Sequence, residues 1–300
     1  MPSSSKFARR GRSLLPGQVS ELTIINVDGS GRQVIFTADE IIEAPNWTPD
    51  GKWLIFNAGG ELWRIAPDGS GLSKIDTGHL DDLNNDHVLS PDGKLIYVSS
   101  DDSHLYVLPT SGGAPTRRIS NLHPHRHHYY LHGVTPDGKT LIYTGVNTLN
   151  DNRWGYVNLW TIPVEGGPDT QLTDYRKPDD GAEYTPDGKW IWFNTEFYSA
   201  GHAQIAKMRA DGSEMTQVTF DERVNWFPHF SPDGQNIVYL SYPEGTPGHP
   251  ADKAVILRYM KPDGTGTRDI VAFNGGQGTI NVNSWAPDNK RFGYVAYPVK

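Results

Sequence analysis

Short runs of alternating apolar and polar residues recur along the chain from residue 21 onward. Two examples are residues 52–56, Lys-Trp-Leu-Ile-Phe, and residues 235–239, Gln-Asn-Ile-Val-Tyr. A period of two is typical of β-strands that pack on one face. Long helices are hard to place, because 32 Gly and 22 Pro punctuate the chain. The pattern therefore predicts an all-β protein built from many short strands.

A Ser/Thr-Pro-Asp-Gly motif divides these strands into repeats. Copies begin at Thr48, Ser90, Thr135, Thr185 and Ser231, and a degenerate Ala-Pro-Asp-Asn copy begins at Ala286. Each copy predicts a tight turn, since Pro fixes φ, Asp can bond the downstream backbone and Gly accepts positive φ. A second Gly-containing turn, such as residues 66–69, follows in the repeats, which gives four strands, a to d. The spacing of roughly 40 to 55 residues is that of a propeller blade.

The two ends of the chain complete one blade. Residues 21–37 have the pattern of strands c and d, whereas residues 284–295 have that of strands a and b. We predict a six-bladed β-propeller of four-stranded antiparallel blades, closed by pairing N-terminal with C-terminal strands in one blade, because closure protects sheet edges. Residues 1–20 are expected to be a flexible N-terminal segment and residues 21–300 a single propeller domain.

Charge and composition exclude several functions. A net charge of -8, with no basic cluster after the first dozen residues, argues against nucleic-acid binding. No apolar run approaches the roughly 18 residues of a membrane span. The absence of Cys excludes thiol catalysis, and no nucleotide or organic cofactor is indicated, because a phosphate-binding Gly loop is missing. No secretory signal is visible, so we expect a cytoplasmic monomer, with the periplasm as the alternative.

The strand order places the d-to-a and b-to-c loops at one mouth of the central channel, where titratable residues collect. His87, His132, Glu183 and His229 precede successive first turns and are expected to approach one another there. Imidazole and carboxylate suit Zn²⁺, Mn²⁺ or Fe²⁺, and acidic loop pairs such as Asp179-Asp180 suit Ca²⁺. The metal ligands would then be His87, His132 and His229.

A metal site of this kind predicts an enzyme. Its catalytic residues would be Glu183, as base or fourth ligand, His132, and Arg153, which would neutralise a substrate carboxylate. The candidate substrate-binding residues, all on the same loops, are Arg126, Tyr130, Trp226, His249, Gln277 and Asn283.

Two observations favour a structural role instead. Inner-strand His residues of a wet propeller channel often bond only water and nearby backbone. In addition, His87 and His132 lie four residues before their prolines, whereas Glu183 and His229 lie three before theirs. Strict alternation would send these two pairs to opposite faces of their blades.

From about residue 21 onward, the repeats resemble those of the TolB-like propellers, whose blades carry Trp-Ser-Pro-Asp-Gly-Lys before an apolar strand. This resemblance implies the propeller fold and a largely periplasmic family whose namesake engages protein partners. The chain also resembles, more distantly, oligogalacturonate lyases, which are propellers with a channel metal held by His and Gln beside a base. It departs from them in having six predicted blades rather than seven and no matching ligand set.

Two hypotheses therefore stand. In the first, the channel mouth binds a divalent metal and acts on a small acidic or oxidised saccharide, by β-elimination or hydrolysis. In the second, the chain is a non-catalytic scaffold for a protein or carbohydrate partner.

Overall fold

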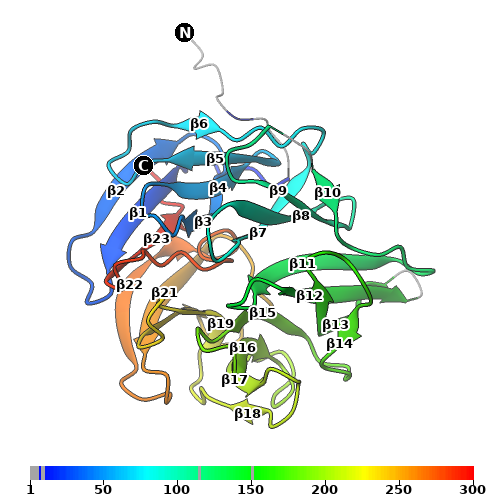
Figure 1. The fold of residues 1–300 in the computed structure, drawn as a ribbon. Coiled ribbons are helices and arrows are strands. Elements are labelled where there is room, and N and C mark those ends of the chain that lie inside the picture. The colour runs from blue at the N-terminus through cyan, green and yellow to red at the C-terminus, as the bar shows by residue number, and fades with distance from the viewer. Residues whose placement is uncertain (1–6, 8–10, 114–115, 150–151) are drawn as a thin grey trace.

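A computed structural model describes residues 7, 11–113, 116–149 and 152–300, with the backbone alone for residues 148, 149 and 152–155. Six sheets follow one another around a ring, from blue through green to red (Figure 1). Within the described ranges the regular elements are all strands, and no helix is long and apolar enough to cross a membrane. The predicted six-bladed propeller is confirmed.

Five blades have four antiparallel strands each, with the innermost strand first in the chain. The first three blades are β3 (Glu43–Trp47), β4 (Leu54–Ala58), β5 (Glu61–Ile65) and β6 (Ser73–Lys74); β7 (Leu83–Leu89), β8 (Leu95–Ser100), β9 (Leu105–Pro109) and β10 (Arg117–Arg118); and β11 (His127–Val134), β12 (Thr140–Leu149), β13 (Asn152–Pro163) and β14 (Thr170–Gln171). The next two are β15 (Asp179–Tyr184), β16 (Trp190–Thr195), β17 (Gln204–Arg209) and β18 (Thr216–Gln217); and β19 (Val224–Phe230), β20 (Ile237–Tyr242), β21 (Lys253–Met260) and β22 (Arg268–Gly275).

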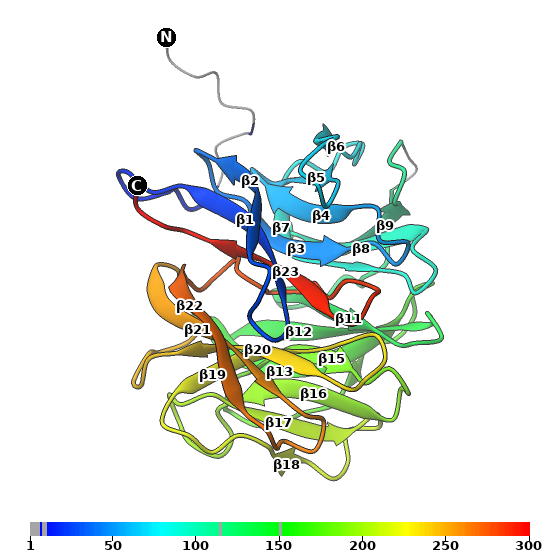
Figure 2. The same cartoon turned by 90° about the vertical axis from the view of Figure 1, so that its left-hand side faces the viewer.

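The sixth blade joins the two ends of the chain, as predicted. Its sheet has the order β2 (Gln33–Ala38), β1 (Ser20–Asn26) and β23 (Arg291–Ala296). β1 and β23 pair antiparallel and lie side by side in Figure 2. The innermost strand of this blade is reduced to one bridge, between Trp285 and Phe292.

The Pro-Asp-Gly turns have the predicted local chemistry, and they also interlock. In the turn at Ser231, the hydroxyl donates to Asp233 Oδ1 at 2.6 Å, and Gly234 has a φ of 69°. Each turn packs on the previous one: a Cβ placed on Gly93 would lie 3.1 Å from Pro49 Cδ. The degenerate turn at Ala286 keeps the geometry because its Asn289 adopts a φ of 60°, which Asn tolerates.

Part of the segment that we expected to be flexible contacts the propeller. Arg12 Nε donates to Glu43 Oε1 at 3.1 Å, and its guanidinium lies over the Tyr297 ring at 4.2 Å. Gln18 Nε2 donates to the Tyr297 carbonyl at 2.9 Å, and Phe7 is buried in the hydrophobic core that the first and sixth blades share. The propeller surface therefore includes contacts from residues before Glu21.

The inner strands do not alternate regularly, and this determines which side chains reach the channel. Register shifts interrupt the pairing of β3, β7, β11, β15 and β19 with their neighbours. In β15 the shift contains Gly181 at a φ of 64°, and in β19 it contains Phe227 at a φ of 55°. An added Cβ on Gly181 would lie 2.7 Å from Asn194 Oδ1, so this bulge requires glycine.

Candidate functional site

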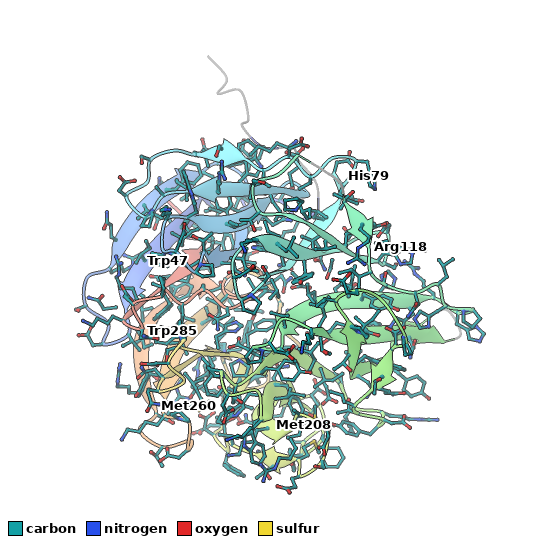
Figure 3. All side chains as sticks on the ribbon, viewed as in Figure 1. Trp47, His79, Arg118, Met208, Met260 and Trp285 are labelled. Atoms are coloured by element: carbon teal, nitrogen blue, oxygen red, sulfur yellow. The ribbon has the colours of Figure 1, made fainter. Side chains whose placement is uncertain are left out.

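Two cavities lie along the channel, one at each end. The turn-side cavity, of about 500 Å³, is surrounded by the first turns and by apolar side chains that include Trp47 and Trp285. Figure 3 labels these two residues on adjacent blades, whereas His79 and Arg118 lie at the outer edge of the ring. The loop-side cavity, of about 220 Å³, is lined mainly by strand residues of the blades, and His249, Gln277 and Asn281 contribute from loops. His132 lines both cavities.

Glu183, which lines the turn-side cavity, is the centre of a closed hydrogen-bond network. Its Oε2 lies 2.7 Å from His229 Nδ1, and its Oε1 accepts from the Phe230 N–H at 3.0 Å and from Asn283 Nδ2 at 2.8 Å. The other imidazole nitrogen, His229 Nε2, donates to the Ile280 carbonyl at 2.6 Å. The network ties three successive blades together at the axis.

The hydrogen-bond partners of His229 determine which of its ring nitrogens carry a proton. A backbone carbonyl only accepts, so Nε2 must carry a proton. Nδ1 faces a carboxylate oxygen, so one more proton lies between His229 and Glu183. With both ring nitrogens occupied, the imidazole has no lone pair left for a metal.

Asp180 is the centre of the loop-side cavity. Its Oδ1 lies 2.7 Å from His132 Nε2 and accepts from the Thr144 hydroxyl at 2.7 Å. Its Oδ2 lies 3.5 Å from His249 Nε2, and His249 Nδ1 is 2.6 Å from Gln277 Oε1. Although burial alone acts in the opposite direction, Asp180 and Asp86 raise the pKa of His132 to about 9, so His132 is an imidazolium at neutral pH.

Asp86 and Asn85 also line this cavity, and each has an unsatisfied buried atom. Asp86 is 4% exposed and Asn85 5%. Asp86 Oδ2 accepts from Asn84 Nδ2 at 3.1 Å, but Asp86 Oδ1 and Asn85 Nδ2 have no hydrogen-bond partner among the described residues. Burial, with a smaller contribution from Asp180, raises the pKa of Asp86 to about 6.

Several predicted site residues do meet. Tyr130, His132, His249 and Gln277 line the loop-side cavity, and Glu183 and Asn283 line the turn-side cavity. Glu183 contacts His229 but not the group around His132, in line with the difference in their spacing from the prolines.

Other predicted residues lie elsewhere. His87 is fully buried and lines neither cavity; burial lowers its pKa to about 4. Trp226 packs behind His249, with ring centroids 4.5 Å apart. Arg126 is exposed, and its Nε donates to His128 Nε2 at 2.7 Å. The side chain of Arg153 lies outside the part of the chain that the structure describes.

The predicted His ligands do not form a metal cluster. Across the described residues, no group of three or more His, Cys, Asp or Glu is placed to hold an ion. The bulges are the physical reason, because they turn His87 away from the cavities and direct His229 toward Glu183 and a backbone carbonyl. His87, His132 and His229, which we named as ligands, therefore do not meet as one cluster among the described residues.

The sequence analysis missed Asp86, Asn85 and Asn281 as cavity residues. Asp86 directly precedes His87, the residue that we selected, and Asp180 was noted only as part of an acidic pair. A signal was available: Asn85, Tyr130, Asp180 and Asn281 all lie six residues before the proline of their blade.

Comparisons with known proteins agree with the repeat pattern. The family model of the TolB beta propeller domain matches residues 135–253. An uncharacterized protein of Agrobacterium fabrum is 37% identical over 283 residues, covering 93% of this chain and 92% of the relative. A solved structure from Agrobacterium tumefaciens, provisionally named TolB, is 35% identical with a TM-score of 0.84 and covers 96% of this chain and 99% of its own.

Two further proteins are more distantly similar to the chain. The Tol-Pal system protein TolB of Francisella tularensis is 26% identical over 95% of this chain, which spans 62% of that protein. An oligogalacturonate lyase solved with manganese is 15% identical, with a TM-score of 0.55, over 86% of this chain and 74% of its own. At that identity the likeness to the lyase shows a shared fold alone.

Proposed function

Because the chain belongs to the TolB-like β-propeller family, we propose that it is a non-catalytic binding propeller that receives a segment of a protein partner at the loop side of its channel. The observation that carries this proposal is the loop-side cavity. It is a recess on a rigid scaffold, lined from several blades. Three buried atoms of its lining residues, Asp86 Oδ1, Asn85 Nδ2 and His132 Nδ1, have no hydrogen-bond partner among the described residues.

The closed turn-side network supports a binding role over a catalytic one. A general base must reach the proton of a substrate, yet Glu183 already accepts hydrogen bonds at both carboxylate oxygens. His229 is occupied at both ring nitrogens. These groups therefore hold blades together and leave no free atom for acid-base chemistry.

Site-specific photo-crosslinking in the native host tests the proposal. A benzoylphenylalanine is placed at Tyr130, which lines the loop-side cavity, or at the exposed Lys139, beside the first turn of the same blade. We expect a discrete protein adduct from position 130 and none from position 139. Equal adducts from both positions, or none from position 130, would contradict the proposal.

A metal-dependent lyase or hydrolase for an acidic or oxidised saccharide is the second candidate. One observation favours it: His249 and Gln277 meet at 2.6 Å beside Asp180, and the resemblance to oligogalacturonate lyases implies a His and Gln ligand set. Metal analysis of untagged protein, and incubation with oligogalacturonate and Mn²⁺, test this candidate. Bound metal together with unsaturated products would replace the binding proposal.

The family also bears on the compartment. TolB-like propellers are largely periplasmic, so kinship favours the periplasm, the alternative to the cytoplasmic location that we expected. Fractionation of host cells with an antibody against the chain would distinguish the two. The monomeric state and a saccharide ligand remain predictions, to be checked by light scattering and by glycan-array binding.

A further inference from the structure

We propose that the loop-side cavity binds a free α-ammonium group together with its neighbouring carbonyl, as found at the N-terminal residue of a peptide. Asp86 would accept from the ammonium, Asn85 would donate to the carbonyl, and the side chain of the bound residue would lie against the apolar wall. The proposal specifies the ligand of the proposed binding function. It rests on that function only where it names a peptide as the source of the ammonium group.

The adjacent unsatisfied atoms of Asp86 and Asn85 indicate the chemistry of the missing group. When its carboxyl is ionised, Asp86 Oδ1 is a hydrogen-bond acceptor and cannot donate, whereas Asn85 Nδ2 is a donor and cannot accept. Buried polar atoms without partners are rare, because each one costs free energy that a hydrogen bond would recover. Asp86 and Asn85 are adjacent in the chain and line the same cavity. A ligand with a donor and an acceptor close together satisfies both.

The charge of the cavity selects a cation as the donor. Its two carboxylates are unequally compensated: Asp180 has His132 Nε2 at 2.7 Å and His249 Nε2 at 3.5 Å. Both histidines also attract Asp86 through space, but its hydrogen bond comes from the neutral Asn84. His249 Nδ1 is already held by Gln277. An ammonium group would give Asp86 the charge-assisted bond that it lacks.

The shape of the cavity selects a small group with an apolar part. Its volume is about 220 Å³, and Val146, Val157 and Phe227 form an apolar part of its wall. These side chains suit an aliphatic residue better than a sugar, which would present hydroxyls to that wall. The half-buried Tyr130 also lines the cavity.

Calorimetric titration with leucinamide tests the site in the full-length protein. We expect a dissociation constant in the millimolar range or tighter for leucinamide, and no binding of N-acetyl-leucinamide, which lacks the ammonium. 3-Methylbutylamine, which lacks the carbonyl, should bind several-fold more weakly. Leu-Ala-Ala-amide distinguishes a peptide ligand from a free amino-acid derivative. If it binds as tightly as leucinamide or more tightly, the ligand is a peptide; if it does not bind, only a small free amine fits the cavity.

Variants and pH locate the binding. Asp86→Asn should weaken leucinamide binding at least tenfold, whereas the control Glu244→Gln, which removes one exposed carboxylate, should leave it unchanged. In the wild type, where Asp180, His132 and His249 face Asp86, affinity should fall as the pH drops through about 6, because Asp86 is then protonated. The pH profile needs no variant and so stays informative if Asp86→Asn fails to fold.

The outcomes separate this inference from the proposed function. Equal binding of leucinamide and its acetylated form, no binding at millimolar concentration, or displacement of leucinamide by Mn²⁺ would overturn the ammonium site. An adduct at position 130 that forms equally in Asp86→Asn would support a partner yet overturn its N-terminal anchor. Leucinamide binding without any adduct would keep the site and remove the protein partner.

Discussion

The two ends of the channel are built from the same strands, yet their buried polar groups are treated differently. On the turn side, both oxygens of Glu183 and both ring nitrogens of His229 have partners from the protein itself. On the loop side, Asp180 is well satisfied, but Asp86 Oδ1 lacks a partner among the described residues. The Glu183–His229 network is complete without a ligand, whereas the carboxylate of Asp86 is not.

Hydrogen-bond satisfaction therefore distinguishes polar residues with a structural role from those with a functional role better than residue type does. The sequence analysis placed His132, Glu183 and His229 in one constellation because all are titratable and lie just before a first turn. In the folded chain, hydrogen-bond satisfaction divides them. A closed network fixes blade packing, whereas an unsatisfied carboxylate is a cost that a bound ligand would offset.

The largest effect should come from breaking the closed network. Glu183→Ala would leave the Phe230 N–H and His229 without their acceptor, and removing one partner of a buried pair costs about 3 to 5 kcal/mol of unfolding free energy. Urea unfolding measures this loss. If the two ends are independent, leucinamide binding by the folded fraction should be unchanged.

Glu183→Gln is the matched control for that experiment. Its amide oxygen can still accept from Phe230, and its amide N–H can donate to an unprotonated His229 Nδ1 while Nε2 keeps its bond to Ile280. We expect a loss of about 1 kcal/mol or less. A loss as large as that of Glu183→Ala would show that the carboxylate charge, rather than the hydrogen bonds, holds the blades.

A smaller effect should appear in the pH dependence of stability. Although burial opposes it, the charge of Asp180 raises the pKa of His132 to about 9, above its ordinary 6.5. The folded state therefore holds this proton more tightly than the unfolded state does. The resulting stability, at most about 3 kcal/mol, is fully present below pH 6.5 and is lost as the pH rises through about 9.

Unfolding free energies between pH 6 and 10 check this expectation. His132→Gln should flatten the decline, because glutamine does not titrate. The control His79→Gln changes an exposed histidine at the outer edge of the ring and should keep the wild-type slope (Figure 3). An unchanged slope in His132→Gln would mean that the ion pair with Asp180 is not the cause.

The fold could be predicted almost entirely from the sequence, because its determinants are local. The Pro-Asp-Gly turn encodes its own hydrogen bonds, as at Ser231 and Asp233, and alternation marks the strand after it. Closure of the ring followed from the incomplete patterns at the two ends, and β1 pairs with β23 accordingly.

The site could be predicted only in part, because bulges break the alternation on which the counting depended. Glu183 and His229 were assigned to one face and do meet. Asp180 meets His132 only because two residues of β15, Gly181 among them, lie unpaired between Asp180 and Glu183. Positive φ is expected at Gly181 but not at Phe227, whose φ is 55°. Such a bulge depends on packing between blades, which no local pattern reports.

The smallest effect, and the one that tests the comparison most directly, concerns the unsatisfied carboxylate. Burial raises the pKa of Asp86 to about 6, so the folded state favours the protonated form, and ionisation at neutral pH destabilises it. Asp86→Asn removes a folded-state penalty of at most about 3 kcal/mol but leaves a buried amide that is not fully hydrogen-bonded. The unfolding free energy at pH 7 should therefore rise by about 1 kcal/mol. The gain should vanish below about pH 4, where Asp86 is protonated in both the folded and the unfolded wild type.

The same variant should lose leucinamide binding, and this combination is what distinguishes a functional residue from a structural one. Replacing a residue that is retained for packing destabilises the protein, whereas replacing a residue that is retained for a ligand can stabilise it. Thermal unfolding of Asp86→Asn and wild type, with and without leucinamide, measures both properties in one experiment. If Asp86→Asn proved less stable than the wild type at pH 7, Asp86 would belong with Glu183 among the structural groups, and the two ends of the channel would no longer differ in kind.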